Sequence, residues 1–264
     1  MTDNPIFRLD GRVAAVVGAG SGIGEATALC AAQQGAHVAC LDVDAAKAEA
    51  TAKAIVAAGG SAEPGSVDIR EGAAVKACFD GIRARKGRLD AVVCTPSINV
   101  RKTLLNYSEE EFERVVAINL RGNFNVLRAA GTIMTEAGRG SIVLVSSIRS
   151  LVVEPGQGVY AMTKAGIVQL VRTAAAEYGP RGVRVNALGP GVTDTPLTAP
   201  IKSNPGWYGA YSDKTILKRW AQASEMAWPT VFLLTDAASY MTGTIVFVDG
   251  GWLAHDGRFV PPGM

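Results

Sequence analysis

Short runs of β-branched and apolar residues recur along the chain and alternate with longer Ala-rich or mixed segments. The runs lie at Val13–Val17, His37–Leu41, Ala91–Cys94, Ser141–Val145, Val183–Ala187 and Ile245–Val248. Segments such as Ala45–Ala58, Glu109–Ala130 and Val159–Tyr178 are long enough to form helices between them. Strands joined by helical crossovers run parallel. The alternation therefore predicts an α/β fold, a doubly wound and mostly parallel sheet with helices on both faces.

The sequence shows no internal repeat, low-complexity tract or Ser/Pro linker. We therefore expect a single domain over residues 1–264. The one shift in composition is Pro196–Tyr211, which is rich in Pro, Gly and aromatic residues and does not resemble a regular crossover. We interpret it as part of a substrate lid inserted at about 195–217, and we expect residues 252–264 to form an extended tail that reaches a neighbouring subunit.

Composition excludes several classes of protein. Apolar residues make up 48% of the chain and charged residues 19%, which is enough for a substantial core. The 26 basic and 24 acidic side chains give a net charge of +2 without long runs of either sign, so no nucleic-acid or membrane partner is expected. The amino terminus lacks an apolar signal core, which predicts a cytoplasmic protein. Four scattered cysteines and two histidines predict neither a disulfide framework nor a metal site.

The first predicted strand runs directly into Gly18-Ala-Gly20-Ser-Gly22-Ile-Gly24, and the helical stretch Glu25–Gln34 follows. Glycines allow a tight turn and let the backbone approach a pyrophosphate, whose charge is favoured by the amides and dipole of a helix start. Glycine clusters also form ordinary turns, but the strand, loop and helix order favours a dinucleotide site.

An acidic residue follows the second predicted strand, at Asp42. This is close to the offset of about 20 residues at which a carboxylate normally binds the ribose hydroxyls of the adenosine half. An acid there repels a 2′-phosphate, and no Arg or Lys lies in the glycine loop or directly after Asp42, so NAD is favoured over NADP. Alternatively Asp42 or Asp44 caps the next helix, a role that Asp44 fits better. Asp68 follows a predicted third strand, where it either contacts adenine or is a solvated turn carboxylate.

Tyr160-Ala-Met-Thr-Lys164 places a phenol and an ammonium group four residues apart, on one face of a helix. Lowering a tyrosine pKa from ~10 toward 7 requires about 4 kcal/mol of preferential phenolate stabilisation. One cation at about 4 Å in an effective dielectric of ~20 is worth a similar amount. The pair therefore predicts a proton-transfer group, although a surface helix face gives the same spacing.

With Ser147, thirteen residues before Tyr160, and the glycine loop, the chain resembles the classical short-chain dehydrogenase/reductase family over about residues 9 to 252. Further landmarks of the family are Asn119, the segment Asn186–Gly191, and Val248-Asp-Gly-Gly251. The resemblance implies a Rossmann-type, seven-stranded, single-domain oxidoreductase that forms a homotetramer through the long helices around Asn119 and Tyr160.

The resemblance also implies a role for each matching residue. Tyr160 would be the general acid/base, and Lys164 would lower its pKa and hold the nicotinamide ribose. Ser147 would bind the substrate oxygen, and Asn119 would hold a water that passes the proton toward Lys164. Ser146 and Ser150 do not have the family spacing. The predicted cofactor-binding residues are Gly18, Gly20, Ser21, Gly22, Ile23, Gly24, Asp42, Asp68, Ile69, Cys94, Thr95, Pro96, Tyr160, Lys164, Pro190, Gly191, Val192 and Thr195.

The chain departs from the family pattern at two segments that touch in the family fold. The family usually has Thr before the first loop glycine and Asn-Asn-Ala-Gly after the fourth strand, whereas this chain has Val17 and Cys94-Thr-Pro-Ser97. Losing both partners of a buried hydrogen bond together leaves no polar group unpaired. We therefore expect altered support beneath the adenine side, with Pro96 stiffening the turn.

By the same analogy, substrate would contact residues after the fourth strand, after Ser147, and in the lid. The polar and aromatic candidates there are Asn99, Arg101, Arg149, Glu154, Gln157, Lys202, Trp207, Tyr208 and Tyr211. This mixture is too polar for a steroid or long acyl chain and predicts a small polyhydroxylated or anionic substrate. Arg101 or Arg149 would pair with a carboxylate-like group; each could equally be a solvated charge or part of an ion pair between subunits.

Together these observations predict an NAD-dependent dehydrogenase of a polyol, a sugar-like alcohol or a hydroxy acid. One alternative keeps the class and reverses the chemistry, as an NADPH-dependent carbonyl reductase; Asp42 argues against it. A second alternative is a non-catalytic dinucleotide-binding protein on the same fold. The set of Asn119, Ser147, Tyr160 and Lys164 argues against this alternative.

Overall fold

One seven-stranded parallel sheet forms the centre of the molecule in the computed structural model, which describes residues 5–256. Its strand order is β3-β2-β1-β4-β5-β6-β9, and every pairing is parallel. The strands are β1 (Val13–Val17), β2 (His37–Asp42), β3 (Ser61–Ser66), β4 (Ala91–Cys94), β5 (Gly140–Val145), β6 (Val183–Pro190) and β9 (Ile245–Val248). The order reverses between β1 and β4, which is where such sheets bind ligands at their carboxyl ends.

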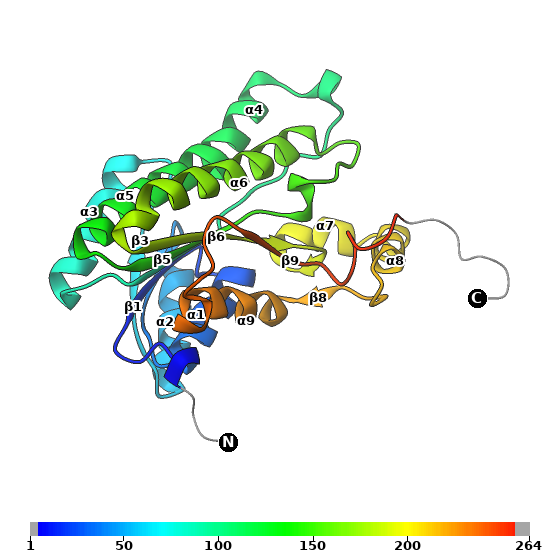
Figure 1. Ribbon diagram of the computed structural model, residues 1–264. Coiled ribbons are helices and arrows are strands. Elements are labelled where there is room, and N and C mark those ends of the chain that lie inside the picture. The colour runs from blue at the N-terminus through cyan, green and yellow to red at the C-terminus, as the bar shows by residue number, and fades with distance from the viewer. Residues whose placement is uncertain (1–4, 257–264) are drawn as a thin grey trace.

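Helices cover both faces of this sheet (Figure 1). They are α1 (Gly22–Gln33), α2 (Ala45–Ala57), α3 (Gly72–Lys86), α4 (Glu109–Val116), α5 (Asn123–Ala137), α6 (Gly158–Tyr178), α7 (Ala199–Lys202), α8 (Pro205–Lys214) and α9 (Ala223–Leu234). Helices α3, α5 and α6 pack on one face, and α1, α2 and α9 on the other, each layer around its own apolar cluster. Strands such as β1 are apolar throughout because both of their faces are buried.

The six strands predicted from the sequence are confirmed; three have the predicted bounds, and the other three are longer by one to three residues. Predicted strand Val183–Ala187 extends to Pro190, and the third strand ends at Ser66, two residues before Asp68. Local signals fix several helix ends. Helix α4 begins at a capping box in which Ser108 and Glu111 bond each other's backbone, and α3 ends at Gly87 with φ of 73°. Across the described chain, none of the helices has the length and apolar character to cross a membrane.

The helix predicted over Glu109–Ala130 is confirmed, and it extends to Ala137 with a change of turn type on the way. A π-helical segment at Ala117–Gly122 separates α4 from α5. The Asn119 side chain lies within this segment, accepts the Ile98 amide at 2.9 Å and donates to the Ile98 carbonyl at 2.9 Å. A widened turn of this kind is often found at functional sites, where it redirects a side chain.

The segment predicted to be a lid is largely helical. It contains a short 3-10 turn at Pro196–Thr198, then α7 and α8. Asn204 caps α8 by accepting the Trp207 amide, and Pro205 occupies the first helical position, where its missing N–H costs no hydrogen bond. A short strand before the lid, β7 (Thr193–Asp194), pairs with a short strand after it, β8 (Ala221–Gln222). Of the predicted tail at residues 252–264, residues 257–264 lie outside the described residues.

Candidate active site

The glycine loop lies at the carboxyl end of β1, beside the point where strand order reverses. Gly18 and Gly22 have positive φ values of 83° and 56°. A Cβ on Gly24 would lie 1.9 Å from the Gly18 carbonyl oxygen, so only glycine allows the turn to close this tightly. The Gly18 and Ala19 amides bond to the Leu41 carbonyl, which fixes the loop against β2.

The start of α1 faces a cavity of about 470 Å³. Ser21 occupies the cap position but makes no side-chain capping bond, so the first amides of α1 have no such partner. The residues that line this cavity include Gly18, Ser21, Gly22, Ile23, Gly24, Asp42, Asp68, Ile69, Thr95, Pro96, Ser97 and Thr195. Uncapped amides at a helix start favour a phosphate group, and the cradle fits the pyrophosphate of a dinucleotide.

The two aspartates at the end of β2 and just after it have different roles. Asp42 lines the cavity, and its carboxylate accepts the Gly20 amide at 2.9 Å and the Asp44 amide at 3.0 Å. Asp44 instead caps α2 by accepting the Ala46 and Lys47 amides. The capping role therefore belongs to Asp44, and Asp42 remains at the cavity wall.

Most of the remaining predicted cofactor residues reach a cavity, and a few do not. Asp68 lines the wall but is paired with Arg70 at 2.5 Å, which holds the pKa of its carboxyl below its usual range. Gly20 contacts Asp42 rather than the cavity. Cys94 is 1% exposed in the core, and burial raises the pKa of its thiol to about 12. Gly191 and Val192 line a second cavity beside Tyr160.

The two departures from the family pattern lie next to each other. Val17 and Cys94 are paired residues of β1 and β4, and both are buried. The Thr95 hydroxyl donates to the Val17 carbonyl at 3.0 Å. This bond fastens the turn after β4 to the end of β1, so the two segments stay connected without the hydrogen bond expected from the family pattern.

Tyr160 and Lys164 lie on the same face of α6, as their spacing predicts. Lys164 is 1% exposed, donates to the Val145 carbonyl at 2.9 Å, and lies 5.4 Å from the centroid of the Tyr160 ring. The Ser146 hydroxyl donates back to the Lys164 carbonyl at 2.8 Å. These two bonds join α6 to the end of β5 in both directions. Ser147 follows directly, and its oxygen accepts the Arg149 amide, which leaves its hydroxyl proton available.

The pKa of Tyr160 is raised above its ordinary value, whereas its spacing from Lys164 led us to expect that it is lowered. Burial raises the pKa of Tyr160, and the Ser147 and Ser97 hydroxyls and the charges of Arg149 and Arg101 act in the opposite direction. Burial also lowers the pKa of Lys164 to about 8. Sequence analysis missed Ser97, whose buried oxygen has no well-aligned hydrogen-bond partner in residues 5–256. Its only sequence signal is that it stands where the family pattern has glycine.

Asn119 is buried, and its side chain is fully engaged. Besides its two bonds to Ile98, its amide nitrogen lies 3.3 Å from the Thr163 hydroxyl. The backbone carbonyl of Asn119 accepts a hydrogen bond from the Asn123 side-chain amide. In this arrangement the Asn119 side chain positions the backbone after Pro96, on the wall of the dinucleotide cavity. Within residues 5–256, no three His, Cys, Asp or Glu side chains gather as they would around a metal ion.

A smaller cavity of about 80 Å³ lies beside Tyr160. Its lining consists of Asn99, Arg101, Ser147, Ile148, Arg149, Gln157, Tyr160, Gly191, Val192, Leu197, Thr198, Ile201, Tyr211 and Trp220. Other predicted substrate residues lie behind this wall. Glu154 binds both arginines, Trp207 lies under Arg101, and Tyr208 stacks on Trp220 with centroids 5.1 Å apart. Lys202 is paired with Asp194 outside the cavity. Trp220 has no local sequence signal.

Comparison with known proteins identifies the family. Residues 18–253 match the family model described as enoyl-(acyl carrier protein) reductase. The chain is 33% identical over 245 residues to a 3-oxoacyl-(acyl-carrier-protein) reductase of Thermotoga maritima, covering 93% of this chain and 99% of the relative. It is 36% identical over 250 residues to a D-threitol dehydrogenase of Mycolicibacterium smegmatis, covering 93% and 94%.

A solved structure, a gluconate 5-dehydrogenase from Burkholderia cenocepacia in complex with NADP and tartrate, superposes with a TM-score of 0.92. Its identity to this chain is 31%, with 95% of this chain and 98% of that chain covered. The fold and the site thus define a nicotinamide-dinucleotide oxidoreductase acting on CH–OH groups. The chain belongs to the short-chain dehydrogenase/reductase family, in its classical form.

The buried Lys164 predicts an unusual pH dependence of stability. Its folded pKa of about 8 lies below the usual 10.5, so between these values the unfolded chain binds a proton that the folded chain does not. The free energy of unfolding should therefore gain up to about 1.4 kcal/mol per pH unit in this window, relative to Lys164→Met. Urea unfolding at pH 7.5, 8.5 and 9.5 measures the difference. The exposed Lys53→Met serves as control, and parallel pH profiles of wild type and Lys164→Met would contradict the assignment.

Proposed function

We propose that this enzyme oxidises a small secondary alcohol, of the polyol, sugar-like or hydroxy-acid type, with NAD as acceptor and Tyr160 as the general acid/base. One observation carries the proposal. The Tyr160 phenol lines the smaller cavity together with Ser147, while the Lys164 ammonium lies behind its ring. A phenol and a hydroxyl at one cavity, with a cation behind the phenol ring, can bind an alcohol oxygen and accept its proton.

The proposal gives a part to each residue at this cavity. Ser147 holds the substrate oxygen with the proton that its bond to Arg149 leaves available. Tyr160 takes the hydroxyl proton of the alcohol, and Lys164 favours the phenolate that must be present beforehand. Arg149 and Arg101 add positive charge that acts in the same direction. When bound, a nicotinamide dinucleotide supplies the hydride acceptor.

The dinucleotide would be held by residues already placed at the larger cavity. The amides at Ser21 and Gly22 would bind the pyrophosphate, and Asp42 the adenosine ribose. By family resemblance, Thr195 at this cavity and Val192 at the smaller cavity would hold the carboxamide. The Asp42 carboxylate at the wall supports NAD over NADP because it would repel a 2′-phosphate. The same carboxylate disfavours NADPH, and it therefore argues against an NADPH-dependent carbonyl reductase.

The lining of the smaller cavity supports a small polar substrate. Asn99, Gln157 and two arginines contribute polar atoms, and Tyr211 of the lid and Trp220 contribute aromatic rings. The relatives described as a D-threitol dehydrogenase and a gluconate 5-dehydrogenase act, by name, on a polyol and a polyhydroxy acid. A cytoplasmic location is part of the proposal, and the four unpaired cysteines fit a reducing compartment.

Tyr160→Phe removes the proton acceptor and keeps the ring. Turnover of the alcohol, followed at 340 nm, should fall by about 100- to 10,000-fold, since general acid/base catalysis is worth this much. NADH binding, measured by fluorescence titration, should change by less than about twofold. Tyr178→Phe, at the far end of the same helix, is the control and should retain activity. Activity retained in Tyr160→Phe would reject the catalytic assignment.

Asp42→Asn removes the charge and keeps an oxygen that can accept the Gly20 amide. The ratio of kcat/KM with NAD to kcat/KM with NADP should fall by at least about tenfold, because a 2′-phosphate is no longer repelled. Asp44→Asn is the matched control, since Asp44 caps α2 and does not line the cavity. A ratio that stays the same in Asp42→Asn would show that Asp42 does not select the cofactor.

We also propose a homotetramer. A groove of about 580 Å³ between α4 and α6 is lined by polar residues such as Ser108 and by apolar side chains, among them Leu104, Phe112 and Met162, and each of these three apolar side chains is exposed. A second copy of the chain would cover them, as the family resemblance implies. Light scattering should give four times the chain mass of 27.5 kDa. Phe112→Glu should give smaller particles, whereas Val56→Glu on α2 should not; a monomeric wild type would refute the assembly.

A further inference from the structure

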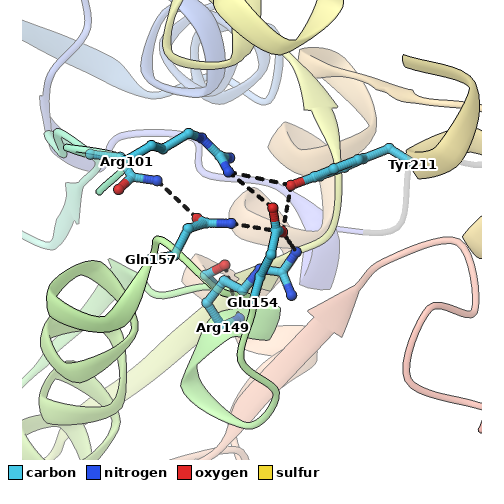
Figure 2. A network of polar contacts seen from close by, with 7 residues as sticks. Arg101, Arg149, Glu154, Gln157 and Tyr211 are labelled. Atoms are coloured by element: carbon cyan, nitrogen blue, oxygen red, sulfur yellow. Dashed lines mark hydrogen bonds and ion pairs between the residues drawn. The ribbon is translucent and has the colours of Figure 1, made fainter. Parts of the chain in front are cut away.

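A single carboxylate gathers side chains from three distant segments at the smaller cavity (Figure 2). Glu154 Oε1 accepts Arg101 Nη1 at 3.1 Å. Its Oε2 accepts Arg149 Nη2, Gln157 Nε2 at 2.8 Å, and the Tyr211 hydroxyl at 2.5 Å. Arg101 follows β4, Arg149 and Gln157 belong to the connection from β5 to α6, and Tyr211 lies on α8 of the lid. We call these five residues the Glu154 cluster.

The Glu154 cluster leaves one positive charge uncompensated. The charged residues that line the cavity are Arg101 and Arg149, and Glu154 lies behind them. Two guanidinium charges against one carboxylate charge give a net charge of +1. Arg149 is only 7% exposed, so solvent screens its charge weakly. The field of both arginines also reaches Tyr160, where it favours the phenolate. A ligand in this cavity therefore meets positive charge.

The same carboxylate fixes the direction of a hydrogen-bond relay. A carboxylate only accepts, so Gln157 must turn its Nε2 toward Glu154. Gln157 Oε1 then faces Asn99 and accepts its Nδ2 at 2.8 Å. This leaves Asn99 Oδ1 buried and without a hydrogen-bond partner in residues 5–256. Asn99 lines the cavity. A buried acceptor without a donor is costly, and a hydroxyl group on the substrate would satisfy it.

The Glu154 cluster also reaches the aromatic residues of the lid and the segment after β9. Burial, and donation to Glu154, raise the pKa of Tyr211, so it remains a hydrogen-bond donor. The Tyr211 ring packs against Trp220 and Trp252. Trp207 lies 5.5 Å from the Arg101 guanidinium, and Trp252 lies 5.4 Å from that of Arg149. Both arginines are therefore held from two sides, by the carboxylate and by an indole ring.

We propose that Glu154 is a specificity-determining positioning residue, which makes the cavity select a hydroxylated monocarboxylate over a neutral polyol and over a dicarboxylate. The substrate carboxylate binds the one uncompensated positive charge of Arg101 and Arg149. A second substrate hydroxyl donates to Asn99 Oδ1, while the reacting alcohol faces Ser147 and Tyr160. This inference rests on the proposed function, because it assumes that an alcohol is oxidised beside Tyr160.

The test uses three four-carbon compounds that differ in charge, namely threitol, threonate and tartrate, with charges of 0, −1 and −2 at neutral pH. Wild type should show the highest kcat/KM, or the tightest competitive inhibition, with threonate. Glu154→Gln raises the net charge of the cluster by one. The ratio of tartrate to threonate should then rise on the order of tenfold. Glu154→Asp keeps the charge and should restore the preference for threonate.

Tyr211→Phe tests the hydrogen bond between the lid and Glu154 independently of the charge of the cluster. It removes one hydrogen bond to Glu154 and leaves the charge balance intact, so KM should rise for all three compounds while their ratios stay the same. Thermal unfolding and NADH binding of each variant check that the fold and the dinucleotide site are unaffected. The inference is overturned if wild type prefers threitol or tartrate, or if Glu154→Gln leaves the tartrate to threonate ratio within about twofold of wild type.

A second readout needs no turnover. Trp207 and Trp252 lie on the two guanidinium groups, so tryptophan emission should respond when a carboxylate binds there. If no alcohol is oxidised but emission still shows tighter binding of threonate, with the shift toward tartrate in Glu154→Gln, the proposed function fails and the charge selection stands. If alcohols are oxidised without any dependence on charge, the proposed function stands and the role of Glu154 fails.

Discussion

The site depends on one buried cation that is held by the sheet. Lys164 has almost no contact with solvent, and its ammonium group donates to the last carbonyl of β5 while the next residue, Ser146, donates back to the Lys164 backbone. This reciprocal contact fixes the height and rotation of α6 against β5. Tyr160, one turn earlier on the helix, and Ser147, one residue further along the strand end, are placed together by the same contact.

The two halves of the site are built in different ways. The dinucleotide half is mainly backbone, with glycines at positive φ and uncapped amides of α1, and one side chain, the Asp42 carboxylate at the end of β2, completes it. Its geometry follows from the sheet. The half that we propose to bind substrate is made of long side chains from two loops and the lid, and it is held by the charges of the Glu154 cluster. The first half suits a ligand common to a large family, whereas the second can change with few substitutions.

This difference explains how far the sequence predicts the structure. The strands can be predicted from the sequence because parallel strands buried on both faces are apolar throughout, as in Val13–Val17. Asp42 and the glycine loop can be predicted as parts of one site because a single β-α-β unit sets their spacing. The π-helical turn at Asn119 cannot be predicted from the sequence, because the bonds that Asn119 makes there are to Ile98, 21 residues away. The pairing of Arg101 and Tyr211 with Glu154 spans 53 and 57 residues, and local patterns carry no information about it.

Cys94 has a consequence for the chemical resilience of the protein. The next residue, Thr95, lines the dinucleotide cavity, but the Cys94 side chain is buried in the core. Burial raises the pKa of this thiol, so it stays protonated at ordinary pH. Peroxides and alkylating reagents attack thiolates, so they have little to react with at this position. The chain thus carries a sulfur atom beside its cofactor site without the sensitivity to oxidants that a sulfhydryl near an active centre usually brings.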